Sequence, residues 1–167
     1  MSSTAAAPTR QKITTFLWFD NQAEEAMNFY VSTFKNSRVL SCSHYGEGMP
    51  LPKGTVLVAT FELDGQQFQA LNGGPQFKFT EAISLSVACD SQQEIDELWE
   101  KLTADGGQES QCGWLKDKYG LSWQIVPRQI GEWLTGDPEK ADRVLKSIMP
   151  MKKLDMQKME DAYNGTA

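Results

Sequence analysis

An internal repeat constrains the fold of this chain more than any other feature. Strand-like residues 13–19 lead into a helix start near Asp20, and strand-like residues 83–89 lead into a second helix start near Asp90. Shifting the chain by 70 residues superposes these two starts, and β-rich segments follow each helix. Chance likeness between two capped helices is the alternative. Because the whole order repeats, the sequence favours two similar modules, each with a sheet that buries one face against a helix.

The first module is predicted to span residues 12–75. Apolar residues recur at helical spacing over residues 23–34. Strands are expected at residues 38–45, 55–63 and 66–72. Asp64-Gly65 joins the last two strands and predicts a type I′ hairpin turn.

The second module is predicted to span residues 76–128. Alternation of apolar and small polar residues over 83–88 predicts a strand, and Ser91 with Glu94 predicts a capping box at the start of a helix. Asp105-Gly106-Gly107 supplies the glycine that a helix end prefers. A further β-rich stretch completes the module.

The two ends of the chain differ from the modules. Residues 1–11 are small and polar, and we expect a disordered leader. Residues 129–167 are expected to form helices, because Asp137-Pro138 is a typical helix start and Pro150 interrupts the apolar periodicity that follows. These helices are expected to pack on their own sheet. A dimer contact or a lid over a binding site is the alternative.

Composition and charge disfavour some classes of partner and location. A formal net charge of -6 disfavours nucleic acid as a partner, and no apolar run reaches the roughly 18 residues of a membrane span. The three cysteines form no C-x-x-C pair, so neither a disulfide framework nor a thiolate zinc site is indicated. We therefore expect a cytoplasmic protein.

Three motifs carry a resemblance to a known family: residues 16–20 (FLWFD), 71–75 (LNGGP) and 112–127 (CGWLKDKYGLSWQIVP). Through them, residues 12–150 resemble the PhnB-like proteins that often carry the label 3-demethylubiquinone-9 3-methyltransferase, within the vicinal oxygen chelate (glyoxalase/bleomycin resistance/dioxygenase) superfamily. The resemblance implies an α+β fold. Its two tandem βαβββ modules would form curled mixed sheets around a cavity, followed by the C-terminal helical extension.

The methyltransferase label implies S-adenosylmethionine. Such cofactors are usually held by a glycine-rich loop between a strand and a helix, with an acidic residue after the next strand. Gly73-Gly74 instead leads through Pro75 into a loop, so it favours a turn. No cofactor is expected.

Enzymes of the superfamily resemble one another in four inward-facing ligands that hold a divalent metal. Carried over by strand register, these positions fall near Thr15, on Ala70 or Asn72, on Ser84 and on Gln124. Their neutral side chains are poor ligands for Zn²⁺ or Fe²⁺, so we expect no metal site. His44 is the single histidine, and we interpret it as an ordinary strand residue. A metal site that uses His44 or Glu62 is the alternative.

Transferring the family's positions to this sequence also predicts a pocket with polar residues at its base and aromatic residues around them. This arrangement is typical of small-molecule pockets. A solvated sheet face would show a similar alternation. The predicted ligand-binding residues are Thr15, Leu17 (or Phe16 in its place), Asn72, Ser84, Ser86, Trp114, Tyr119, Trp123 and Gln124. Lys116 and Asp117 are weak catalytic candidates as acid or base, and a charged hairpin tip is their plainer interpretation. Cys112 is interpreted as structural.

The leading functional hypothesis is a metal-free homodimer that binds, sequesters or slowly transforms a small planar or aromatic compound. A metal-dependent glyoxalase- or dioxygenase-like enzyme is one alternative, and the methyltransferase of the family label is another. A third is an interaction module whose Met-rich tail binds a partner protein.

Overall fold

The computed structural model describes residues 11–166, and the chain divides into two compact units, Met1–Lys78 and Phe79–Ala167. The predicted boundary between the modules lay at residue 75. Of the predicted leader, only Gln11 is among the described residues. The side-chain amide of Gln11 donates to the backbone oxygen of Gln67 and accepts from its backbone nitrogen, at 3.0 Å each.

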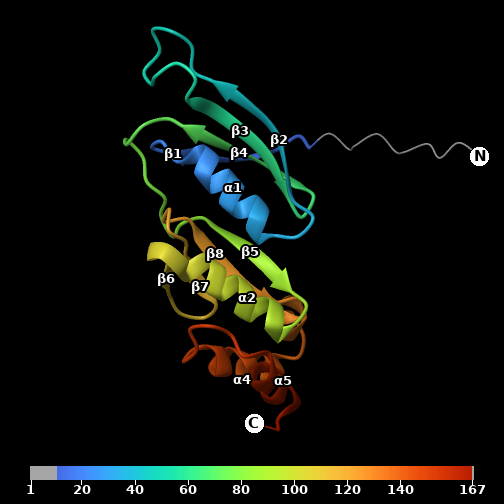
Figure 1. Ribbon diagram of the computed structural model, residues 1–167. Coiled ribbons are helices and arrows are strands. Elements are labelled where there is room, and N and C mark those ends of the chain that lie inside the picture. The colour runs from blue at the N-terminus through green and yellow to red at the C-terminus, as the bar shows by residue number, and fades with distance from the viewer. Residues whose placement is uncertain (1–10, 167) are drawn as a thin grey trace, which may run out of the picture. The chain divides into compact units, whose positions relative to one another are not determined.

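The first unit is one four-stranded mixed sheet with a helix on one face (Figure 1). Its strand order is β1-β4-β3-β2, with β1 parallel to β4 and the other pairs antiparallel. The elements in chain order are β1 (Thr15–Phe19), α1 (Ala23–Thr33), β2 (Arg38–His44), β3 (Val56–Leu63) and β4 (Gln66–Asn72).

Packing in the first unit follows the predicted helical stripe. Ala23, Ala26, Met27 and Tyr30 of α1 are buried, and Phe61 and Phe68 are the buried aromatic residues of the facing strands. The hairpin between β3 and β4 also forms as predicted, since Asp64 and Gly65 both have positive φ, which a type I′ turn requires.

The second unit repeats this arrangement, with strand order β5-β8-β7-β6 and β5 parallel to β8 (Figure 1). The α+β fold of two βαβββ modules is therefore confirmed, and neither sheet closes on itself. The elements in chain order are β5 (Ser84–Cys89), α2 (Gln92–Thr103), a 3₁₀ turn η1 (Ala104–Gly106), β6 (Gln108–Glu109), β7 (Trp114–Lys116) and β8 (Ser122–Pro127).

Helix α2 starts as its sequence predicts. The Ser91 side chain accepts a hydrogen bond from the Glu94 backbone nitrogen at 3.1 Å. The Glu94 carboxylate in return accepts from the backbone nitrogen of Asp90 at 2.7 Å, one residue earlier than in the standard capping box. The apolar stripe of α2 is buried against its sheet.

The C-terminal extension forms three helices, α3 (Ile130–Thr135), α4 (Pro138–Ile148) and α5 (Met156–Asn164). Asp137 caps α4, with Pro138 at its first position, as predicted. α3 lies within the predicted helical region and begins before the predicted helix start at Asp137. Within α4, Val144 and Ile148 are buried, whereas Leu145 and Met149 are exposed.

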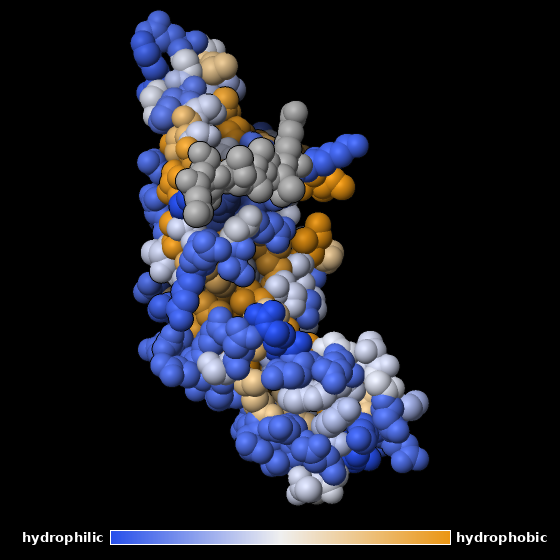
Figure 2. Space-filling model, turned by 90° about the vertical axis from the view of Figure 1, so that its right-hand side faces the viewer, coloured by the Kyte–Doolittle hydropathy of each residue, from blue (hydrophilic) through white to orange (hydrophobic). Residues whose placement is uncertain are grey.

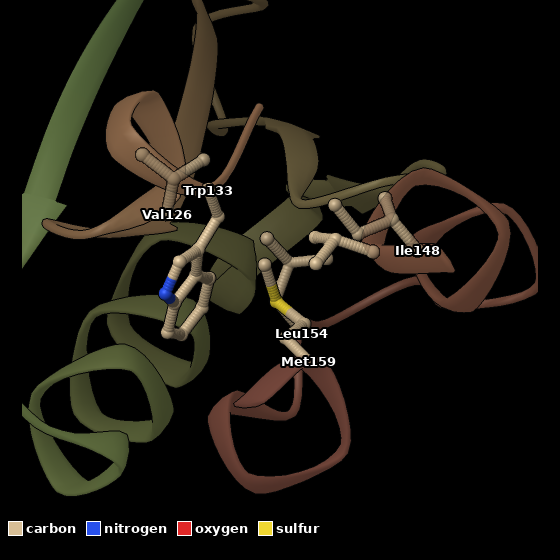
Figure 3. Close-up of a cluster of buried hydrophobic side chains, with 6 residues drawn as sticks. Val126, Trp133, Ile148, Leu154 and Met159 are labelled. Atoms are coloured by element: carbon tan, nitrogen blue, oxygen red, sulfur yellow. The ribbon is translucent and has the colours of Figure 1, made fainter. Parts of the chain in front are cut away.

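A cluster of buried side chains joins this extension to the second sheet (Figure 3). Val126 of β8 belongs to the cluster, so the C-terminal helices pack on the sheet of their own unit, as expected from the sequence. The remaining members are Trp133, Val144, Ile148, Leu154 and Met159. In agreement with this inward packing, the surface of the extension is mostly hydrophilic at the lower end of Figure 2.

Candidate functional site

Side chains of each sheet alternate between a face covered by the helix and an open face. In the second sheet, Trp123 and Ile125 are buried on the side of α2, and their strand neighbours Ser122 and Gln124 therefore point to the other side. The register then assigns the residues that share this side. We define the second open face as Ser84, Ser86, Trp114, Lys116, Ser122 and Gln124.

Three polar residues form the centre of the second open face. Gln124 Nε2 donates a hydrogen bond of 2.8 Å to Ser84 Oγ, across the parallel β5–β8 pair. Ser122 lies directly opposite Ser84 in the same ladder. Its hydroxyl is buried and has no hydrogen-bond partner within residues 11–166. Ser122 was not among the predicted binding residues, although its position two residues before Gln124 on the same strand could have revealed it.

Trp114 and Lys116 border this polar centre on β7. Trp114 lies opposite Gln124, and Lys116 lies opposite Ser122. The Lys116 ammonium forms an ion pair with Glu81, which precedes β5. The hydrogen bond from Lys116 holds the pKa of the Glu81 carboxyl below its ordinary value.

Three predicted binding residues of the first unit lie on the helix side of their sheet. Thr15 and Leu17 share the buried side of β1, and Leu17 belongs to the core. Asn72 is buried, and its side chain accepts from the Ala23 backbone nitrogen at 2.8 Å and donates to the Val56 oxygen at 2.9 Å. These contacts hold the start of α1 in place, so the structure gives Asn72 a structural role in place of the predicted one.

The first open face instead presents Phe16, Thr60, Glu62 and Gln69, which the register places on one side. A register shift of one residue moves every side chain of a strand to the opposite face. The positions transferred from the family were shifted by one residue on β1 and β4. Gln69 is paired with Phe16 as Gln124 is paired with Ser86, so the two glutamines hold equivalent positions in the two modules.

Two further predicted residues have structural roles in the second unit. Asp117 is 2% exposed; its Oδ1 accepts from the backbone nitrogens of Tyr119 and Leu121, and its Oδ2 accepts from Trp123 Nε1 at 2.9 Å. Trp123 is likewise buried on the helix side. These contacts favour the plainer interpretation of Asp117, a residue of the hairpin tip. Tyr119 is half-buried in the turn, with Lys118 Nζ 5.5 Å from its ring centre.

The residues of the open faces do not suit a transition metal. No group of three or more His, Cys, Asp or Glu side chains within residues 11–166 is arranged to hold a metal ion. His44 is paired with Val56, whereas Glu62 lies six residues further along β3, about 20 Å away, so the two cannot share one ion. Glu62 is also held by Arg38 Nε at 2.8 Å.

The double glycine after β4 does not form a cofactor loop. Trp18 lies against Gly73 so closely that a Cβ there would be 2.4 Å from its ring, and Trp18 Nε1 donates to the Gly74 oxygen at 2.9 Å. These glycines therefore make room for an indole, and no helix start follows them. The residues present do not fit S-adenosylmethionine.

A family model described as 3-demethylubiquinone-9 3-methyltransferase matches residues 11–126, which excludes the C-terminal helices. A search of curated proteins found no match. No helix within residues 11–166 is long and apolar enough to cross a membrane.

Solved structures agree with the family match. A PhnB protein of Bacillus cereus, titled a putative 3-demethylubiquinone-9 3-methyltransferase, is 46% identical, with a TM-score of 0.65 over 70% of this chain and 99% of its own. The protein PA1353 of Pseudomonas aeruginosa is 19% identical (TM-score 0.58; 71% and 98% covered). The fosfomycin resistance protein FosX of Listeria monocytogenes, solved with Mn(II) and sulfate, is 15% identical (TM-score 0.53; 75% and 96% covered). The last two support the fold alone.

Proposed function

Because the chain belongs to the 3-demethylubiquinone-9 3-methyltransferase family of the vicinal oxygen chelate superfamily, we propose that it binds a small organic molecule on the second open face. Binding uses the side chains of that face, without a metal ion and without a methyl donor. The family label names a reaction whose cofactor the residues of this chain do not fit. The proposal therefore follows the geometry of the site.

The unpaired hydroxyl of Ser122 is the single observation that carries this proposal. A buried polar group without a partner costs about 1–3 kcal/mol, and folded proteins pair nearly all such groups. Ser122 lies beside the hydrogen-bonded pair Ser84 and Gln124, so the unsatisfied group belongs to a polar row and is not isolated in the core. A ligand that reaches this row gains the missing hydrogen bond.

Trp114 supplies the apolar side of the site. It is half-buried, and its indole N–H donates to no acceptor in the described part of the chain. An indole offers a broad face to a planar compound and a polar edge for one hydrogen bond. Small-molecule sites commonly combine such a face with a few placed polar groups.

The second open face is better suited to binding than to catalysis. Lys116 is paired with Glu81, and Asp117 uses both carboxylate oxygens to hold the β7–β8 turn. Neither is placed as a free acid or base. Sequestration is therefore the simplest form of the function, with slow transformation as its extension.

The test uses Ser122→Ala in two measurements. Removing an unpaired buried hydroxyl should raise the free energy of unfolding by about 1 kcal/mol, because a desolvated group disappears. The same change should weaken, about fivefold or more, the binding of compounds found by ligand-observed NMR in an aromatic library. Ser41→Ala, on the exposed strand β2, should change neither quantity. Unchanged affinity for every hit in Ser122→Ala would refute the proposal.

The protein is further proposed to be a homodimer. β1 and β2 border the first sheet, and β5 and β6 border the second; each pairs on one side only within the described residues. Unpaired strand edges favour association with another chain. Light scattering at micromolar concentration tests this, and a monomeric mass would contradict it.

We also propose a cytoplasmic location, because the cysteine thiols are free. Cys42, Cys89 and Cys112 are all free, as is usual in a reducing compartment. Fractionation of cells that express a tagged chain tests the location, and recovery of the protein in a secreted fraction would contradict it.

A further inference from the structure

We infer that the ligand of the second open face is an aromatic carboxylate, and that its carboxylate takes the place of Glu81 on Lys116. This inference rests on the proposed function and specifies the chemical class of the ligand. It follows from the hydrogen-bonding character of the site, from the exposed ion pair and from the spacing of the strands.

Three side chains of the second open face can each donate a hydrogen bond to a ligand. Ser84 Oγ already accepts from Gln124, so its own O–H remains as a donor. The Ser122 hydroxyl has no partner among the described residues, and the Lys116 ammonium can only donate. A ligand group that only accepts hydrogen bonds, and carries negative charge, fits these three residues best.

The register places these donors side by side. Lys116 is opposite Ser122 in the β7–β8 ladder, and Ser122 is opposite Ser84 in the β5–β8 ladder. Neighbouring strands lie about 4.8 Å apart, so the backbones of Lys116 and Ser122 are one strand spacing apart. The two oxygens of a single carboxylate can accept from both side chains.

The ion pair between Glu81 and Lys116 is exposed and therefore weak. The side chain of Glu81 is 61% exposed and that of Lys116 is 34% exposed. Exposed ion pairs contribute only about 0–1 kcal/mol, so another carboxylate can replace Glu81 at little cost. Glu81 lies in a turn before β5, whereas Lys116 lies within β7. The carboxylate is thus on the more easily moved element, and the cation is on the sheet.

The exchange also accounts for the buried hydroxyl. Lys116 lies directly opposite Ser122, so a carboxylate that replaces Glu81 on Lys116 arrives beside the unpaired Ser122 hydroxyl. Trp114 lies two residues from Lys116 on the same strand, about 7 Å away. An aromatic ring that bears a carboxylate can bridge this separation, with its ring on the indole and its charge at the ammonium.

The experiment compares acids with their uncharged amides. Benzoate and 2-naphthoate, with benzamide and 2-naphthamide as matched probes, are titrated into the full chain by calorimetry. The Trp114 indole signal is followed by NMR and assigned with Trp114→Phe. We expect at least one acid to bind tenfold more tightly than its amide and to shift the Trp114 signal.

Two variants locate the charge dependence. Glu81→Gln removes the internal competitor and should strengthen acid binding severalfold, with no effect on the amides. Lys116→Met should weaken acid binding at least tenfold and leave the amides unchanged. Glu47→Gln breaks the more exposed pair with Lys53 in the first unit and should change nothing. Because Glu81 lies outside the strands, its variant remains decisive even if Lys116→Met fails to fold.

The outcomes separate the two proposals. Acids and amides that bind equally well, with no effect of Glu81→Gln, overturn the carboxylate inference and leave the binding function intact. If none of the four probes binds, the carboxylate inference is overturned by itself, and the Ser122→Ala test on library hits decides the binding function.

Discussion

Asp64 lies in the turn between β3 and β4, and Asp117 lies in the turn between β7 and β8, but their carboxylates make very different contacts. Asp117 is buried and accepts from two backbone nitrogens and from the indole of Trp123. Asp64 is exposed, and its carboxylate has only a long contact of 3.5 Å with Asn36. The same substitution, aspartate to asparagine, should therefore have opposite consequences at the two positions.

The cost of Asp117→Asn follows from the geometry. An amide that keeps its oxygen toward Tyr119 and Leu121 must turn its NH₂ group toward Trp123 Nε1–H, so two donors face each other. The lost bond to a charged acceptor contributes about 1.5–3 kcal/mol, and the buried indole N–H is left unpaired. Turning the amide over loses two backbone bonds instead. We expect a loss of about 3 kcal/mol in the free energy of unfolding.

Urea unfolding followed by tryptophan fluorescence measures this difference, with the slopes compared to check that the unfolded states are alike. Asp64→Asn should stay within about 0.5 kcal/mol of the parent protein, because asparagine tolerates positive φ and the surface contact is weak. Equal losses at the two positions, or a loss below about 1 kcal/mol at Asp117, would refute the assignment of Asp117 as the residue that holds the turn.

Three further predictions concern packing and ionisation. Gly73→Ala should cost about 2 kcal/mol, because its Cβ would meet the Trp18 ring at 2.4 Å, whereas Gly131→Ala, in open space on α3, should stabilise by about 0.5–1 kcal/mol; thermal unfolding compares them. Leu154→Ala should cost about 3 kcal/mol because the side chain is fully buried, and Leu145→Ala, half exposed, should cost under about 1 kcal/mol in urea unfolding. Burial raises the pKa of the Cys89 thiol to about 12, so Cys89 should resist a thiol reagent at pH 8 in the native protein and react once the protein is unfolded. Stability should also fall as the pH rises from about 9 toward 12, because the unfolded thiol ionises first; reaction of native Cys89 at the unfolded rate would contradict this account.

Features set by local chemistry were predictable from the sequence. The Asp64-Gly65 turn needs two residues that tolerate positive φ, and the start of α2 needs a serine that accepts from a nitrogen three residues on. The repeat of strand, capped helix and strands fixed the module order in the same way. Each of these depends on neighbours within a few positions.

The site was harder to predict because its chemistry depends on contacts between distant segments. Asn72 looks like a polar lining residue until its partner Ala23, 49 positions away, shows that it caps a helix. Short strands with mixed residues also leave the choice of face open, so Leu17 and Phe16 were both candidates. Ser84, Ser86, Trp114, Lys116 and Gln124, by contrast, do share one face, because β5 and β8 alternate more clearly.

The parallel pairs at the edge of each sheet have a consequence for the order in which the chain acquires its structure. β1 touches only β4 within its sheet, and β5 touches only β8. Thr15 thus finds its partner Phe68 close to the end of its unit, after the antiparallel hairpin of β3 and β4 can already have formed. Parallel pairing of strands that are distant in sequence is slow, because the loop-closure entropy is lost before the contacts that offset it can form. On a ribosome, the first strand of each module therefore waits without a partner until the last strand of that module has emerged.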